Sequence, residues 1–116
     1  MRYLLLIGSD NKNPGPPPPP AEMQAILQGH MKLGEALRAA GKVVAAERLR
    51  PDSDGARIRA KAGHHQVMDG PFAETKEAIG GFYLIDCDTK AEAVEWAKKV
   101  PLGDGGFVEV RPIWPM

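Results

Sequence analysis

The sequence has little of what several large protein classes require. Its single cysteine, Cys87, excludes an intramolecular disulfide and a cysteine-rich metal site. The apolar run from Tyr3 to Ile7 is far shorter than the roughly 18 residues that span a bilayer. Basic and acidic residues number 15 each, so no net positive charge attracts nucleic acid or an anionic membrane. We therefore expect a cytoplasmic protein with no nucleic acid and no membrane among its partners.

Motifs for common cofactors are also missing. The chain contains no HExxH, no paired CxxC, no phosphate loop and no GxGxxG spacing. We therefore expect no bound cofactor and no metal. The composition is that of a folded protein, because a chain of 116 residues with 43% hydrophobic and 26% charged residues is large and apolar enough to form one buried core. We expect a single domain over residues 1–116.

The first third of the chain predicts a strand, a loop and a helix. The apolar run from Tyr3 to Ile7 is typical of a strand buried on both faces. Residues 11–21 form a proline-rich loop that includes the unbroken run Pro16 to Pro20. Such a run can dock on an aromatic groove of another protein, but a spacer leading into a helix is the interpretation that we favour.

A helix is predicted from Glu22 to about Ala40, ended by a glycine. Apolar residues recur at helical spacing, and His30 and Gly34 fall inside the apolar arc, so His30 points inward. The glycines at 29 and 34 weaken a helix interior and indicate a close approach, for which simple packing is the favoured reason. The apolar positions are Met23, Ile26, Leu27, Leu33 and Leu37.

The remaining elements follow from alternation and capping patterns. A half-exposed strand from Ala56 to Ala62 turns at Gly63 into a second strand, which gives a hairpin with a basic outer face. Thr89 and Glu92 have capping-box spacing at the start of a second helix. Further strands are predicted at Lys42–Glu47, Phe82–Ile85 and Phe107–Val110.

The order β-α-β, hairpin, β-α-β predicts an α+β fold. It suggests a ferredoxin-like split β-α-β sheet with an inserted β-hairpin and both helices on one face. The strands at Tyr3–Ile7 and Phe82–Ile85 look apolar on both sides, so the second face of the sheet needs a cover. A second copy of the chain is the simplest cover, and we expect a homodimer with a pocket near the subunit junction.

The stretch Asp69 to Asp86, DGPFAETKEAIGGFYLID, resembles the DGPF-domain subgroup of the YCII-related family. The resemblance extends over nearly the whole chain, from the opening MRYLLLIG to the closing VEVRPI. It implies a ferredoxin-like fold assembled as a dimeric α/β barrel. That family is largely uncharacterised and its members are described mostly as possible enzymes, so the resemblance names no reaction.

The resemblance also implies an active-site histidine on the first helix. His30, Leu33, Leu37 and Gly41 match the pattern of that family, in which the histidine pairs with an aspartate from elsewhere. We predict His30 as the acid/base group and Asp69 as its catalytic partner, with Glu47 as second choice. The competing interpretation is a core histidine satisfied by a carbonyl or water.

The charged loop after Asp69 is the predicted substrate-binding segment. Glu74 and Lys76 are the candidate binding residues, because loops on rigid scaffolds often carry function. The alternative is ordinary turn chemistry, with Phe72 placed in the core. His64 and His65 are neighbours on a strand and point to opposite faces, so they cannot chelate one metal together. Cys87 is expected to be a buried small hydrophobe.

The leading hypothesis is a small cytoplasmic homodimer that binds or converts a small metabolite by proton transfer through His30. The alternative is a non-catalytic regulatory module, linked to transcription control, that binds a protein partner through Pro16–Pro20 or the charged loop. A third possibility is a purely structural fold without a pocket. The sequence leaves all three open.

Overall fold

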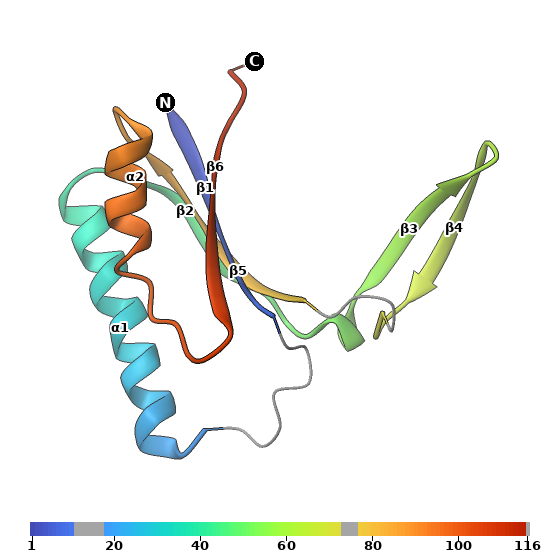
Figure 1. The fold of residues 1–116 in the computed structure, drawn as a ribbon, viewed down its shortest axis with the longest axis horizontal. Coiled ribbons are helices and arrows are strands. Elements are labelled where there is room, and N and C mark those ends of the chain that lie inside the picture. The colour runs from blue at the N-terminus through green and yellow to red at the C-terminus, as the bar shows by residue number, and fades with distance from the viewer. Residues whose placement is uncertain (11–17, 73–76, 116) are drawn as a thin grey trace.

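The computed structural model describes residues 1–10, 18–72 and 77–115 (Figure 1). Glu74 and Lys76, the predicted substrate-binding residues, therefore lie outside the described residues. So does the first part of the proline run, while Pro18 and Pro19 lead directly into the first helix.

The described residues form six strands and two α-helices of an α+β fold, in the order that the sequence predicts. A short 3-10 turn, Asp52–Asp54, precedes the hairpin. The elements are β1 (Arg2–Ser9), α1 (Pro20–Ala39), β2 (Val43–Arg48), β3 (Ala56–Lys61), β4 (His64–Asp69), β5 (Ala78–Asp86), α2 (Lys90–Ala97) and β6 (Gly106–Pro112).

Four strands make one antiparallel sheet in the order β2-β5-β1-β6. The strands on either side of α1, β1 and β2, are separated in the sheet by β5, which is the arrangement that a split β-α-β unit produces. Figure 1 shows α1 and α2 on the same side of this sheet. The architecture is compatible with the predicted ferredoxin-like fold.

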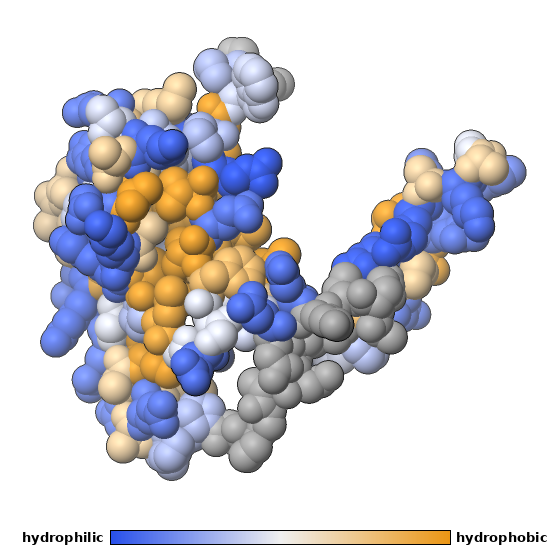
Figure 2. All heavy atoms as spheres, in the orientation of Figure 1, coloured by the Kyte–Doolittle hydropathy of each residue, from blue (hydrophilic) through white to orange (hydrophobic). Residues whose placement is uncertain are grey.

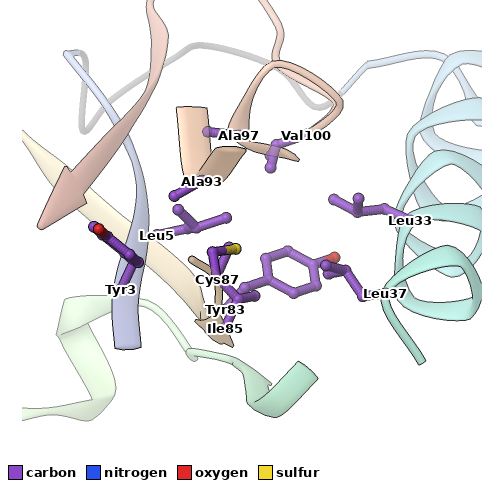
Figure 3. Packing of buried hydrophobic residues seen from close by; sticks show 10 residues of the cluster. All are labelled: Tyr3, Leu5, Leu33, Leu37, Tyr83, Ile85, Cys87, Ala93, Ala97 and Val100. Atoms are coloured by element: carbon purple, nitrogen blue, oxygen red, sulfur yellow. The ribbon is translucent and has the colours of Figure 1, made fainter. Parts of the chain in front are cut away.

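The core lies between the two helices and the face of the sheet that they cover (Figure 3). Leu5 and Ile85 from the central strands and Leu37 from α1 are fully buried there. Cys87 belongs to the same cluster, which confirms the prediction of a buried small hydrophobe. The other members are Tyr3, Leu33, Tyr83, Ala93, Ala97 and Val100.

The opposite face of the sheet is only half-buried in one copy of the chain. Burial alternates along β1 and β5, so that Leu4, Leu6, Phe82 and Leu84 stay partly exposed between buried neighbours. The prediction that these strands are buried on both faces is therefore not met within a single chain. Two helices cover one face of a sheet, and the described residues place no element on the other.

Both helices begin as their sequences require. Pro20 occupies the first turn of α1, where a missing N–H costs nothing, so the helix starts inside the predicted 11–21 loop. The side chain of Thr89 accepts a hydrogen bond from the Glu92 N–H at 3.2 Å. Glu92 in turn accepts from the Asp88 N–H at 3.0 Å and pairs with Lys42 at 3.2 Å. The predicted capping interaction is confirmed, and it ties α2 to the start of β2.

The β3–β4 hairpin stands apart from the rest of the chain, on the side of the sheet away from the helices (Figures 1 and 2). Positive φ angles at Ala62 and Gly63 make its tight turn, as predicted. The prediction of a half-exposed strand is wrong, because Ile58 and Val67 face each other across the hairpin with 67% and 70% of their surfaces exposed. Each hairpin strand pairs with the other in a two-stranded sheet, and the described residues leave the face of Ile58 and Val67 exposed.

Candidate functional site

A cavity of about 470 Å³ lies between the N-terminal half of α1 and the sheet. This volume falls in the range of sites that hold small molecules. Figure 2 shows apolar side chains gathered in the region between α1 and the strands. The cavity is lined by Ile7, Met23, Ile26, Leu27, His30, Ala46, Glu47, Arg48, Gly80, Gly81, Phe82 and Tyr83.

The cavity exists because α1 packs closely on the sheet along only part of its length. Leu33 and Leu37 are buried in the core, whereas Leu27 is 44% exposed. A Cβ added to Gly29 would lie 2.6 Å from the Pro101 side chain, so the loop after α2 presses against the helix at this level. This contact confirms that packing is the reason for Gly29. Gly34 has no comparable neighbour, because the nearest atom to an added Cβ is 3.8 Å away on Arg38.

The floor of the cavity is open because two successive glycines occupy β5. A Cβ added to Gly81 would lie 2.7 Å from the carbonyl oxygen of Glu47, so only glycine fits between β5 and β2 here. Opposite Gly81 in the register is Arg48. Because glycine has no side chain, Arg48 is the residue of this pair that has one.

His30 reaches from α1 to the sheet, as the helical periodicity predicts. Its Nδ1 lies 2.8 Å from the phenolic oxygen of Tyr83, and the two rings are stacked with their planes 14° apart. Tyr83 belongs to the core cluster, so the phenol that holds the imidazole is itself fixed by packing. His30 is thus a partly buried histidine with a defined orientation at a cavity wall.

The surroundings favour the neutral form of His30. Burial lowers the pKa of the imidazole, and the positive charge of Arg48 lowers it further. Burial also raises the pKa of Tyr83, so the phenol keeps its proton at neutral pH. When Tyr83 donates to Nδ1, the ring carries its hydrogen on Nε2; when Nδ1 donates to the phenol, Nε2 is free to accept a proton. A ligand therefore meets either a donor or a base at Nε2.

Arg48 is on the same face of the sheet as Tyr83. A bulge between Val43 and Ala45 shifts the register of β2, after which Ala46 pairs with Tyr83, Glu47 with Phe82 and Arg48 with Gly81. Residues paired across strands share a face. The bulge therefore places Arg48 on the face covered by α1, and Glu47 on the opposite face, although both border the cavity.

The two predicted carboxylate partners of His30 lie in different places. Glu47 borders the cavity, and Asp69 ends β4, where it pairs with Ala56 in the separate hairpin sheet. Among the described residues, the hydrogen bond of the imidazole is to Tyr83 and to neither carboxylate. The pairing of His30 with Asp69 stays a prediction.

The described residues after Asp69 make packing contacts. Phe72 is buried, with the guanidinium of Arg57 4.2 Å from the centre of its ring. The Phe72 N–H donates to Asp52 at 3.3 Å. These contacts hold the base of the hairpin, outside the main core cluster.

Within residues 1–10, 18–72 and 77–115 no group of three or more histidine, cysteine or acidic side chains is placed to hold a metal ion. His64 and His65 are consecutive exposed residues of β4. None of the helices that the structure describes is both long and apolar enough to cross a membrane.

The sequence patterns indicate His30 as a candidate residue, but they do not indicate Tyr83 or Arg48, which also line the cavity. Tyr83 could have been found from the alternation of Phe82–Ile85, which places it on the face toward the helices together with Ile85. Arg48 carried no usable signal, because its face depends on the bulge in β2.

Comparison with known proteins places the chain in a family. An uncharacterized protein of Rhizobium meliloti (strain 1021) is 47% identical over 76 residues, which cover 64% of this chain. The matched region spans 61% of that protein, less than two thirds of its length. A family model for the YCII-related domain matches residues 1–116. The chain therefore belongs to the YCII-related domain family.

Proposed function

We propose that the protein binds a small metabolite in the cavity beneath α1 and exchanges a proton with it through His30. The observation that carries this proposal is the 2.8 Å contact between His30 Nδ1 and the Tyr83 hydroxyl at the wall of a mostly apolar cavity. A histidine that only filled space in the core would not need a cavity beside it. General acid-base catalysis requires an oriented group with a pKa near neutral, and an imidazole meets both conditions.

Tyr83 is a positioning residue in this proposal. Its hydroxyl selects which ring nitrogen of His30 carries the hydrogen, and its packed ring fixes the plane of the imidazole. The phenol takes the place that the resemblance assigns to a carboxylate. Asp69 remains a candidate catalytic partner of His30, and in a dimer the second copy of the chain would supply it.

We further propose that the working unit is a homodimer of two such domains, arranged as a dimeric α/β barrel. The half-buried face of Leu4, Leu6, Phe82 and Leu84 supports it, because an apolar sheet face requires a cover. The free, buried thiol of Cys87 is compatible with the reducing cytoplasm. Leu6→Arg should convert a dimer to a folded monomer in sedimentation equilibrium, and a wild-type chain that sediments as a monomer would contradict the dimer.

A thermal-shift screen of a metabolite library tests the binding site. A ligand at 100-fold its dissociation constant stabilises by about 2.7 kcal/mol. We expect a compound that raises the melting temperature of the wild type and of His64→Gln but not of His30→Gln. His64 is the matched control because it is an exposed histidine of β4, away from the cavity.

Turnover assays on each compound found in this way test the catalytic step. His30→Gln should lack turnover even at compound concentrations high enough to restore binding, because the amide cannot exchange protons near neutral pH. A variant as active as the wild type would limit the site to binding. Silence across the whole library would instead favour the alternative, a regulatory or protein-interaction module.

A further inference from the structure

Arg48 is the feature of the cavity that the proposed function does not use. It borders the cavity and belongs to the face of the sheet that α1 covers. Two other arginines at the surface have carboxylate partners, since Arg50 pairs with Asp54 at 3.0 Å and Arg111 with Glu109 at 2.9 Å. Arg48 forms no ion pair with any residue that the structure describes. Within the described part of the chain, a cation that forms no ion pair therefore lies at the edge of the cavity.

Most of the remaining cavity wall is apolar. Met23, Ile26 and Leu27 contribute to it from α1, and Ile7 from β1. His30 is kept neutral by burial and by Arg48 itself, so it adds no second positive charge. Glu47 also borders the cavity, although it pairs with Phe82 and so belongs to the face of the sheet away from α1. The site thus offers one positive group and one neutral proton-exchanging group on the face under α1, together with an apolar surface, while the Glu47 carboxylate lies at its border on the other face.

We propose that the cavity takes a small carboxylic acid, whose carboxylate lies at Arg48 and whose apolar body packs against Met23, Ile26 and Leu27. This inference rests on the proposed function, because it names the substrate class of the same site. A guanidinium binds a carboxylate with two parallel hydrogen bonds. A phosphate dianion would need more positive charge than one arginine supplies, and a neutral ligand would leave the exposed guanidinium paired with water alone.

The arrangement gives the acid a fixed direction in the cavity. Its charged end lies at the end of β2, and its apolar end lies along α1. His30 extends from α1 toward Tyr83 on β5, and so faces the part of the ligand next to the carboxylate. Proton transfer at a carbon or oxygen close to the carboxylate is the chemistry that this geometry suits.

Paired acids and amides test the charge requirement directly. The probes are hexanoate and 3-phenylpropanoate, each compared with its neutral amide, and binding is followed by the NMR signal of the Met23 methyl group. We expect the acids to bind the wild type at least about tenfold more tightly than the amides, as one charge-assisted pair provides. Arg48→Gln should abolish that preference.

Arg50→Gln is the matched control, because Arg50 lies two positions further along the chain and does not border the cavity. It should keep the preference for acids. Equal binding of acid and amide to the wild type would overturn the inference. So would an equal loss of the preference for acids in Arg48→Gln and Arg50→Gln. Acids and amides that all leave the Met23 signal unmoved would overturn it too.

These outcomes are distinguishable from failure of the proposed function. A neutral library compound that requires His30 would leave the proposed function standing while the carboxylic acid is refuted. If no compound of any class requires His30, the site itself is refuted.

Discussion

The two halves of α1 carry out different tasks with similar side chains. The C-terminal half places Leu33 and Leu37 in the core, while the N-terminal half leaves Leu27 partly exposed and lines a cavity with His30. Both halves present apolar residues at helical spacing, so amphipathicity does not distinguish them. The difference lies in what they face, which is long side chains of the sheet in one case and glycines of β5 in the other. A helix thus lines a cavity where the facing strand has glycines in place of larger side chains.

The largest expected effect separates two leucines of this helix. Leu37→Ala should lower the free energy of unfolding by about 2–5 kcal/mol, because it empties a fully buried position. Leu27→Ala should cost less than about 1 kcal/mol, because its side chain already faces the cavity. Urea unfolding at fixed protein concentration measures both changes. Equal losses would mean that the N-terminal half packs as tightly as the C-terminal half.

Two glycines should respond in opposite directions. Gly29→Ala should destabilise by about 1–3 kcal/mol, because its new Cβ collides with Pro101. Gly34→Ala should stabilise by up to about 1 kcal/mol, because alanine suits a helix interior and the space is open. Melting temperatures of the two variants against wild type provide the comparison. A stable Gly29→Ala variant would show that the loop carrying Pro101 moves away without cost.

Tyr83→Phe removes the hydroxyl but keeps the packed ring. We expect a loss of about 0.5–1.5 kcal/mol in stability, the usual contribution of one hydrogen bond. The more specific result is spectroscopic, because the nitrogen chemical shifts of His30 should lose the preference for one tautomer. A tautomer ratio that is unchanged in Tyr83→Phe would show that the phenol does not position the imidazole.

The smallest expected effect is the pH dependence of stability that His30, at the cavity end of α1, contributes. The folded state lowers the pKa of His30 below its ordinary value of 6.5, so the unfolded chain binds that proton more strongly. The stabilisation that comes from the neutral His30 should therefore be complete above pH 6.5 and decrease as the pH falls through the folded-state pKa of His30. Comparing the wild type with His30→Gln at about pH 5 and about pH 8 isolates the contribution. A stability difference between the two proteins that is the same at both pH values would contradict the shift.

The elements of the fold could be predicted because each is encoded in a short stretch. Helical spacing places His30 inward, and Thr89 with Glu92 marks the start of α2. The partners of His30 could not be predicted in the same way. Which residue meets His30 depends on how far α1 is displaced along β5, a property of tertiary packing and not of local pattern.

The bulge in β2 is the clearest example of a feature that local pattern does not reveal. Without it, strict alternation from Val43 would place Glu47 beneath α1. The extra residue between Val43 and Ala45 exchanges the two faces and brings Arg48 there. A single inserted residue thus decides which of the two charged side chains belongs to the face under α1.

The position of β1 in the sheet has a consequence for the order of folding. Tyr3 pairs with Ile85 on one side and with Pro112 on the other, so both neighbours of this strand come from late in the chain. Contacts between such distant residues form slowly, because long loops must close before the pairing stabilises them. During synthesis the leucines of β1 emerge long before either partner exists. We therefore expect β1 to remain open to chaperones or to aggregation until β6 has left the ribosome.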